Sequence, residues 1–174
     1  LKKNMGAGYC RNLAIKKSKS QFCAFLDSDD LWEKNKLKTQ INFMVKNNYH
    51  FTYTYYYTIN ENDKFIKSIL TPKKFNFESF IKNTSIATST MILDRTLIKK
   101  TKFPNTKICE DYFFKCQILK KIDYAICYPF FLTKYRIRKN SLQSNRFKNL
   151  IWMWKINKNL NHFNSFKNFI SLLF

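Results

Sequence analysis

The 174-residue sequence is poor in glycine, proline and acidic residues, with two Gly, three Pro and only 11 Asp+Glu. A hydrophobic fraction of 45% and an aromatic fraction of 18% exclude an intrinsically disordered chain. The longest apolar run, residues 125–132, contains Pro129 and falls far short of the ~18–20 residues that a spanning helix needs. The length and composition therefore predict one compact domain without a transmembrane helix.

The five cysteines form no CxxC pair, and the two histidines lie far apart in the sequence. This spacing excludes the common zinc sites. Because the cysteines stand among apolar residues, we expect buried free thiols in a reducing compartment. The positions are Cys10, Cys23, Cys109, Cys116 and Cys127.

The net charge of +21 has two interpretations. Such an excess attracts polyanions such as nucleic acid, anionic lipid or phosphorylated substrates. However, only five basic residues are Arg, and an excess of Lys, Asn, Ile, Phe and Tyr is also what A/T-rich codons produce. No helix-turn-helix, zinc-finger or RNA-recognition signature is present, so we predict no nucleic-acid partner.

Hydrophobic periodicity predicts an α/β fold with a mixed sheet flanked by helices. A short apolar run at residues 22–26 is typical of a strand buried on both faces, and helical patterns stand on either side of it. The expected helices are residues 10–19, 31–46, 110–122 and 146–173, the last with a break near Asn164. The expected strands are residues 22–26, 51–59, 65–70, 84–93 and 130–137.

An acidic cluster directly follows the first predicted strand and contains Asp27, Asp29 and Asp30. In open α/β sheets, ligands bind beyond the carboxyl ends of the strands. Strand periodicity directs Asp27 and Asp29 to the same side, where two carboxylates suit Mg²⁺ or Mn²⁺. Asp30 has an equal alternative interpretation as a helix cap, because Glu33 stands three residues later.

A second acidic pair, Glu110 and Asp111, opens a predicted helix. Acidic residues are favoured there by the helix dipole, which is the simpler interpretation. The functional interpretation is a general base that takes a proton from a hydroxyl. Near the N-terminus, Gly6 and Gly8 suggest a flexible turn rather than a dinucleotide-binding loop, because Arg11 occupies the third glycine position. Arg11 itself is a candidate anion contact or an ordinary surface residue.

In this order, the motifs resemble those of the bacterial family 2 glycosyltransferases, which have the GT-A fold. The first match is Asn4, Gly6 and residues 10–12; the second is the Leu-Asp-Ser-Asp-Asp of residues 26–30 with Trp32, Lys36, Leu37 and Gln40. The third match is residues 89–91 with Glu110 and Asp111, and the fourth is residues 135–138 with Ser141 and Ser144. The resemblance implies a glycosyltransferase domain over residues 1–145 followed by a helical tail over residues 146–174.

The resemblance also implies roles for individual residues. Asp27 and Asp29 would form the DxD motif that holds a Mn²⁺ or Mg²⁺ ion and the diphosphate of a nucleotide-sugar, with Arg11 on the nucleotide side. Asp111 would be the catalytic base of an inverting transfer, with Glu110 beside it. Arg136 would lie near the phosphates. Arg138 stands where the family usually has a histidine.

The implied function is transfer of a sugar, most simply from a UDP-sugar, to a saccharide or lipid-linked acceptor during envelope polysaccharide synthesis. The expected location is the cytoplasmic face of the bacterial plasma membrane. We also expect the first strand–helix–strand unit of the fold, which holds the donor base and ribose, to be absent from this chain. An inactive glycosyltransferase fragment is therefore the alternative, and a basic nucleic-acid-binding module is a weaker one.

The basic, aromatic tail has two interpretations. Basic amphipathic helices rich in aromatic residues lie on anionic membranes. A helix that packs on its own domain explains the same pattern equally well.

Overall fold

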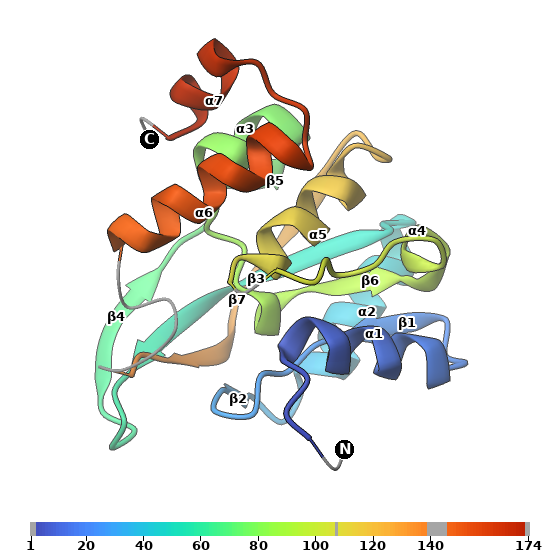
Figure 1. Cartoon of the computed structure of the whole chain (residues 1–174). Coiled ribbons are helices and arrows are strands. Elements are labelled where there is room, and N and C mark those ends of the chain that lie inside the picture. Colours follow the sequence, from blue (N-terminus) through green and yellow to red (C-terminus); the bar gives the residue numbers. More distant parts are fainter. Residues whose placement is uncertain (1–2, 107, 139–145, 173–174) are drawn as a thin grey trace.

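The computed structural model describes residues 3–106, 108–138 and 146–172. In these residues one mixed sheet of seven strands has the order β1-β6-β3-β7-β2, with β4 beside β3 and β5 beside β7 (Figure 1). The strands are β1 (Phe22–Ala24), β2 (Leu31–Trp32), β3 (Phe51–Ile59), β4 (Phe65–Ile69), β5 (Lys74–Phe75), β6 (Ile92–Asp94) and β7 (Ala125–Arg136). Ser141 and Ser144, which belong to the fourth motif, lie outside the described residues.

The centre of the sheet is the parallel pair of β3 and β7. β3 is built from Thr and Tyr with Phe51 and Ile59 at its ends, and these β-branched and aromatic residues favour strands. The pairing runs from Thr52 opposite Ile126 to Ile59 opposite Arg136, with register shifts in the middle. Because of this long pairing, the C-terminal end of β7 reaches the acidic residues that follow β1.

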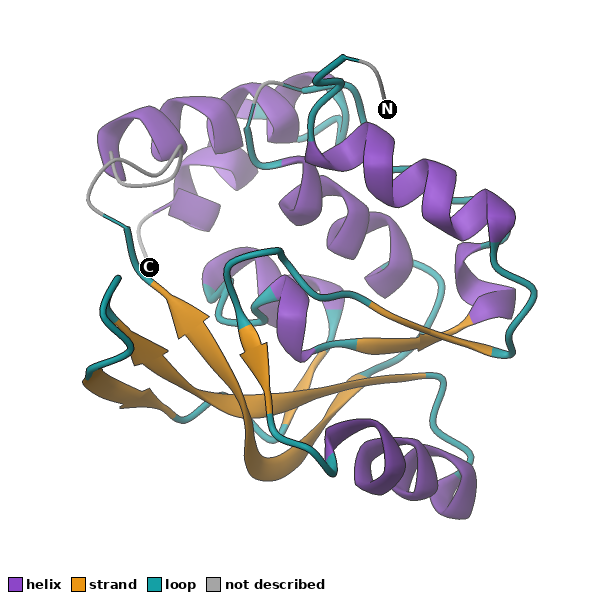
Figure 2. Cartoon of the chain, turned by 90° about the horizontal axis from the view of Figure 1, so that it is seen from below, coloured by secondary structure: helices purple, strands orange, loops and turns teal. Residues whose placement is uncertain are grey.

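Helices cover both faces of the sheet (Figure 2). α2 lies on one face, and α1, α3 and α5 to α7 lie on the other. The helices are α1 (Ala7–Lys17), α2 (Lys36–Asn47), α3 (Phe77–Lys82), α4 (Arg95–Ile98), α5 (Glu110–Leu119), α6 (Arg146–Asn159) and α7 (Ser165–Leu172). Residues Thr88–Thr90 form a single 3-10 turn, η1.

The main core lies between the sheet and the larger helical layer. Phe103 and Phe114 stack face to face with ring centroids 3.9 Å apart, and Phe25 contacts both rings edge-on. Burial of these rings stabilises the place where α1, β1 and α5 meet. The same three elements position the candidate site.

Two predicted elements are wrong in position. Residues 84–93 are not one strand, because Thr88–Thr90 form η1 and only Ile92–Asp94 pair with β1 and β3. The Thr90 hydroxyl donates to the Ala87 carbonyl at 2.7 Å, a local bond that competes with a strand ladder. The helix predicted to begin at residue 31 begins at Lys36, because Leu31 and Trp32 pair with β7 as β2.

The remaining predicted elements are confirmed, β3 with both predicted ends and the others with shifted ends. The first strand ends at Ala24 rather than at residue 26, and β7 begins at Ala125 rather than at residue 130. α1 begins at Ala7 because Gly6, whose φ of 82° favours glycine, precedes it. The predicted tail helix and its break near Asn164 correspond to α6 and α7.

The cysteine prediction is wrong at one position. Cys23, Cys109, Cys116 and Cys127 are buried free thiols, whereas Cys10 is exposed on α1. Within the described residues, no helix is both long and apolar enough to cross a membrane.

Candidate active site

The acidic residues after β1 form a tight turn rather than an extension of the strand. The Asp30 amide donates to the Asp27 carbonyl at 3.0 Å and closes this turn. Because the chain turns here, strand periodicity does not set the directions of Asp27 and Asp29. Their side chains are 32% and 30% exposed, respectively, so both carboxylates are accessible from solvent.

Asp30 is the buried anchor of the acidic turn. Its Oδ2 accepts from the Ser89 hydroxyl at 2.5 Å, and its Oδ1 accepts from the Arg136 amide at 2.9 Å. The Ser89 hydroxyl oxygen in turn accepts from the Asp27 amide at 3.1 Å. Burial raises the pKa of Asp30 to about 6, although both hydrogen bonds act in the opposite direction.

The predicted capping role of Asp30 is therefore wrong. α2 begins five residues after the position that a cap at Asp30 requires, and its N-cap is Asn35. Asp30 instead holds the acidic turn between η1 and β7, through partners that are 59 and 106 residues away in the sequence.

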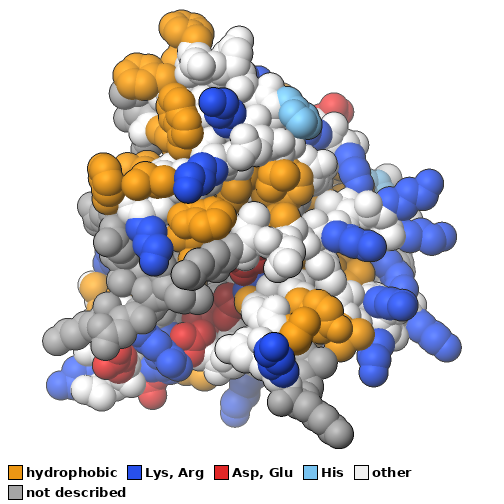
Figure 3. All heavy atoms as spheres, viewed as in Figure 1, with side chains coloured by type: hydrophobic (Ala, Val, Ile, Leu, Met, Phe, Trp, Pro, Cys, Tyr) orange, Lys and Arg blue, Asp and Glu red, His pale blue; other side chains and the backbone are white. Residues whose placement is uncertain are grey.

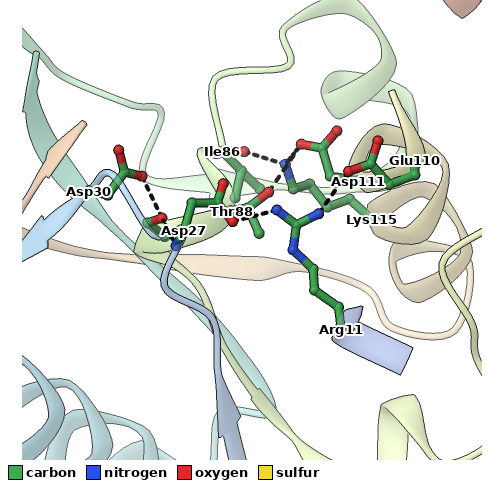
Figure 4. A network of polar contacts seen from close by, with 9 residues as sticks. Arg11, Asp27, Asp30, Ile86, Thr88, Glu110, Asp111 and Lys115 are labelled. Atoms are coloured by element: carbon green, nitrogen blue, oxygen red, sulfur yellow. Dashed lines mark hydrogen bonds and ion pairs between the residues drawn. The ribbon is translucent and has the colours of Figure 1, made fainter. Parts of the chain in front are cut away.

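Arg11 joins the acidic turn to α5. Its guanidinium pairs with Asp27 through Nη2 and with Glu110 through Nη1, the latter at 2.8 Å (Figure 4). The Arg11 and Glu110 side chains are largely shielded, at 14% exposed each, whereas Asp27 is 32% exposed and remains accessible. The geometry thus supports a role for Arg11 in the site rather than on an open surface.

Gly8 permits this close approach of α1 to α5. A Cβ at Gly8 would lie 3.2 Å from Cγ of Glu110 and 3.3 Å from the Pro104 carbonyl oxygen. These distances are tighter than ordinary contacts, and the backbone oxygen cannot rotate away. Gly8 is therefore a packing residue of the site, which the sequence interpretation as a flexible turn missed.

Asp111 lies at the start of α5 and accepts from two other segments. Its Oδ2 accepts from the Thr88 hydroxyl at 3.1 Å and from Lys115 Nζ at 2.7 Å. Lys115 Nζ also donates to the Ile86 carbonyl at 2.7 Å, and the Lys115 side chain is only 3% exposed. Burial alone raises the pKa of Asp111, but the neighbouring ammonium group outweighs burial and lowers this pKa to about 2.

The turn, α1 and α5 surround one cleft of about 270 Å³. Its polar lining includes Arg11, Asp27, Glu110, Asp111 and Lys115. Tyr56 and Tyr135 from the central strands also line it, as do Asn149 and Met153 of α6. Figure 3 shows acidic side chains gathered in a recess of this face, although the molecule as a whole is strongly basic.

Arg136, predicted near the phosphates, and Arg138, which replaces the histidine of the family, both lie next to the acidic turn. Arg136 Nε donates to the Asp29 carbonyl at 2.7 Å, and Nη2 pairs with Asp63 at 2.6 Å. Its Nη1 donates to the Asn60 carbonyl at 2.9 Å, so the guanidinium ties β7 to the turn between β3 and β4. Arg138 Nε lies 3.1 Å from Asp29 Oδ2.

The acidic turn offers two hard oxygen ligands, Asp27 and Asp29, for a divalent cation. In the part of the chain that the structure describes, no group of three or more His, Cys, Asp or Glu side chains could hold a metal ion. A pair of accessible carboxylates suits Mg²⁺ or Mn²⁺, which takes its remaining ligands from water and from substrate phosphates. The donor set therefore fits a substrate-completed site rather than a closed protein cage.

Sequence comparisons identify relatives over most of the chain. At 41% identity over 152 residues, the chain matches the "UDP-Glc:alpha-D-GlcNAc-diphosphoundecaprenol beta-1,3-glucosyltransferase WfgD" of Escherichia coli, covering 87% of this chain and 59% of the relative. At 34% identity, it matches the "Putative teichuronic acid biosynthesis glycosyltransferase TuaG" of Bacillus subtilis, covering 85% of this chain and 59% of the relative. The chain thus spans about six tenths of the length of these relatives.

A structure comparison gives the same fold. The crystal structure of Staphylococcus aureus TarS 1–349 in complex with UDP-GlcNAc aligns with a TM-score of 0.67 and 18% sequence identity, covering 97% of this chain and 51% of TarS 1–349. The GT-A-like fold that the motifs imply is confirmed by this likeness. The sequence model of the Glycosyl transferase family 2 matches residues 1–114, and the chain therefore belongs to that family.

Proposed function

We propose that the chain acts as a glycosyltransferase that moves a sugar from a UDP-sugar to a lipid-linked saccharide. The observation that carries this proposal is the single cleft in which Asp27, Arg11 and Asp111 converge from three separate segments. The relatives supply the substrate classes, since the name of WfgD specifies UDP-Glc and an acceptor linked to diphosphoundecaprenol. The process is envelope polysaccharide synthesis, at the inner face of the plasma membrane.

In the proposed reaction, Asp111 is the general base. Its carboxylate takes the proton of the acceptor hydroxyl while that oxygen bonds to the anomeric carbon of the donor sugar. The bond between the anomeric carbon and the diphosphate breaks on the opposite face, so the configuration inverts. The Lys115 ammonium keeps Asp111 ionised, and the Thr88 hydroxyl fixes the direction of its Oδ2.

Asp27 and Asp29 would hold the Mn²⁺ or Mg²⁺ ion on the donor side. When bound, this cation neutralises the charge that develops on the leaving diphosphate. Arg11 adds a positive charge beside Asp27, and Glu110 fixes the guanidinium from α5. Arg136 donates to the Asp29 carbonyl and so would position this backbone beside the phosphates of the donor.

The test is a transfer assay with radiolabelled UDP-glucose and a synthetic GlcNAc-diphosphoryl lipid. Asp111→Asn removes the base and keeps the shape, so we expect transfer to fall at least about 100-fold. Asp123→Asn is the matched control, because Asp123 is exposed outside the cleft and its replacement leaves transfer unchanged. Equal transfer by wild type and Asp111→Asn would refute the assignment of the base.

The same assay tests the alternative of an inactive fragment. If wild type binds UDP but transfers no sugar to the lipid-linked acceptor, the non-catalytic interpretation replaces the one proposed.

A further inference from the structure

The inner face of the tail packs on its own domain. Ile156 and Asn157 of α6 are buried, and Asn157 Oδ1 accepts from the Tyr112 hydroxyl of α5 at 2.8 Å. Phe163, between α6 and α7, packs edge-on against Phe77 of α3. The packing interpretation of the tail is therefore confirmed for this face.

The same two helices also carry a set of exposed apolar side chains. We call it the tail face, and its apolar members are Phe147, Leu150 and Ile151 of α6 with Phe166 and Phe169 of α7. Phe147 and Phe166 are 72% and 74% exposed, so the two rings lie almost entirely in solvent. Figure 3 shows apolar side chains crowded over α6 and α7. A group of exposed apolar side chains of this kind marks an interaction site.

The charge of the tail favours one kind of partner for this surface. Residues 124–174 contain no Asp or Glu, whereas residues 146–174 contain five Lys and Arg, of which Lys167 pairs with Glu78 of α3 at 2.8 Å. Lys148, Lys155 and Lys158 are exposed on the same helix as Phe147 and Ile151. A second copy of the chain would bring like charges together, whereas an anionic lipid surface neutralises them while it buries the apolar side chains.

The tail face also lies next to the candidate active site. Asn149 and Met153 line the cleft, and they belong to the same helix as Phe147 and Ile151. A helix with its side chains is about 10–12 Å across. A surface that contacts the outer side of α6 is therefore only about one helix diameter from the cleft.

We propose that the tail face seats the chain on an anionic phospholipid membrane and brings the cleft to the level of the lipid headgroups. Five exposed apolar side chains enter the boundary between headgroups and acyl chains, and the lysines contact phosphates. This inference rests on the proposed function in one respect, since a headgroup-level cleft suits an acceptor attached to a lipid through phosphate. The binding of the chain to lipid does not depend on catalysis.

The test is co-sedimentation of the full chain with vesicles. One set of vesicles contains phosphatidylglycerol and phosphatidylcholine, and the other contains phosphatidylcholine alone. The double variant Phe147→Ser/Phe166→Ser removes the two most exposed rings of the tail face. Its matched control is Phe65→Ser/Phe130→Ser, which removes two rings that are 62% and 53% exposed on β4 and β7. Circular dichroism spectra that match wild type show that each variant is folded.

We expect the tail variant to lose at least about tenfold in partitioning onto anionic vesicles, and the control to bind like wild type. A second pair compares Lys155→Gln/Lys158→Gln with Lys38→Gln/Lys46→Gln, which removes two exposed charges of α2. Here too we expect only the tail variant to lose binding, and the loss to be confined to vesicles with phosphatidylglycerol. Equal binding by the tail variants and their controls would overturn the proposal, because attraction would then come from the overall charge.

Two further outcomes separate this inference from others. If the tail face instead joins two copies, size-exclusion chromatography shows a dimer that Phe147→Ser/Phe166→Ser abolishes, and vesicle binding is absent; this overturns the proposal. Transfer to a short, water-soluble acceptor is measured on the same variants and stays at the wild-type level. If the tail variants lose vesicle binding but keep transfer to the soluble acceptor, the membrane surface is supported independently of the cleft. If the wild type binds vesicles but transfers no sugar, the membrane surface is supported and the proposed function is refuted.

Discussion

Replacement of Lys115 by methionine tests whether the ion pair in the wall of the cleft determines the protonation state of Asp111. Lys115 Nζ lies 2.7 Å from Asp111 Oδ2 and is almost fully buried. The pKa of Asp111 falls from an ordinary 3.8 to about 2, so its ionised form is more stable in the folded chain than in the unfolded one, by on the order of 2 kcal/mol. Because this pKa is lowered by folding, the contribution is present above pH 3.8 and is lost as the pH falls toward 2.

We expect Lys115→Met to lower the free energy of unfolding at pH 7 by about 2–4 kcal/mol, because it leaves a shielded carboxylate without its cation. Asp111→Asn removes the charge that needs the cation. In the Asp111→Asn background, the same lysine replacement should therefore cost only about 1 kcal/mol. Urea unfolding of the wild type, both single variants and the double variant, followed by circular dichroism, measures the coupling as a double-mutant cycle. A coupling energy below about 0.5 kcal/mol would refute the ion pair as the controlling interaction.

Three other perturbations test separate parts of the structure. Burial lowers the pKa of Lys36 to about 7. The unfolded chain therefore binds more protons than the folded one between pH 7 and 10.5, and the free energy of unfolding rises with pH across this window. Lys36→Met should reduce this rise between urea titrations at pH 7 and pH 9, and an unchanged pH dependence would contradict the lowered pKa. Arg11→Met leaves the Asp27 and Glu110 carboxylates unpaired, and calorimetry should show a fall in Tm of about 4–12 °C for a loss of about 2–3 kcal/mol. Gly8→Val forces a side chain against the Pro104 carbonyl and Glu110 and should cost about 1–3 kcal/mol in urea unfolding; wild-type stability would show that α1 is free to move away.

Local composition was sufficient to predict much of the fold. β3 is confirmed with both predicted ends, because nine strand-forming residues stand in succession and no other local structure competes for them. The prediction of one strand over residues 84–93 is wrong because Ser and Thr occur both in strands and in turns held by local side-chain hydrogen bonds. Thr90 makes such a bond to the Ala87 carbonyl. Leu31 and Trp32 join the sheet only because β7 lies beside them, which is information that a helical pattern does not contain.

The site was predicted in part for the same reason. The clusters of Asp27 and Asp111 stand out in a chain with few acidic residues, and the structure brings them to one cleft. The partners of Asp30 lie 59 and 106 residues away, so no local pattern distinguishes its anchoring role from a helix cap. Lys115 was also missed, since one lysine among many becomes informative only when it is buried against a carboxylate.

The most direct test of the central claim is calorimetric titration of UDP into the chain with and without Mn²⁺. If the acidic turn holds the cation and the diphosphate of the donor, UDP binds only with Mn²⁺, and Asp29→Asn weakens binding at least about tenfold. The matched control, Asp123→Asn, should bind UDP like wild type, because Asp123 lies outside the cleft. UDP binding that is unchanged by Asp29→Asn would contradict the assignment of the acidic turn to the nucleotide-sugar.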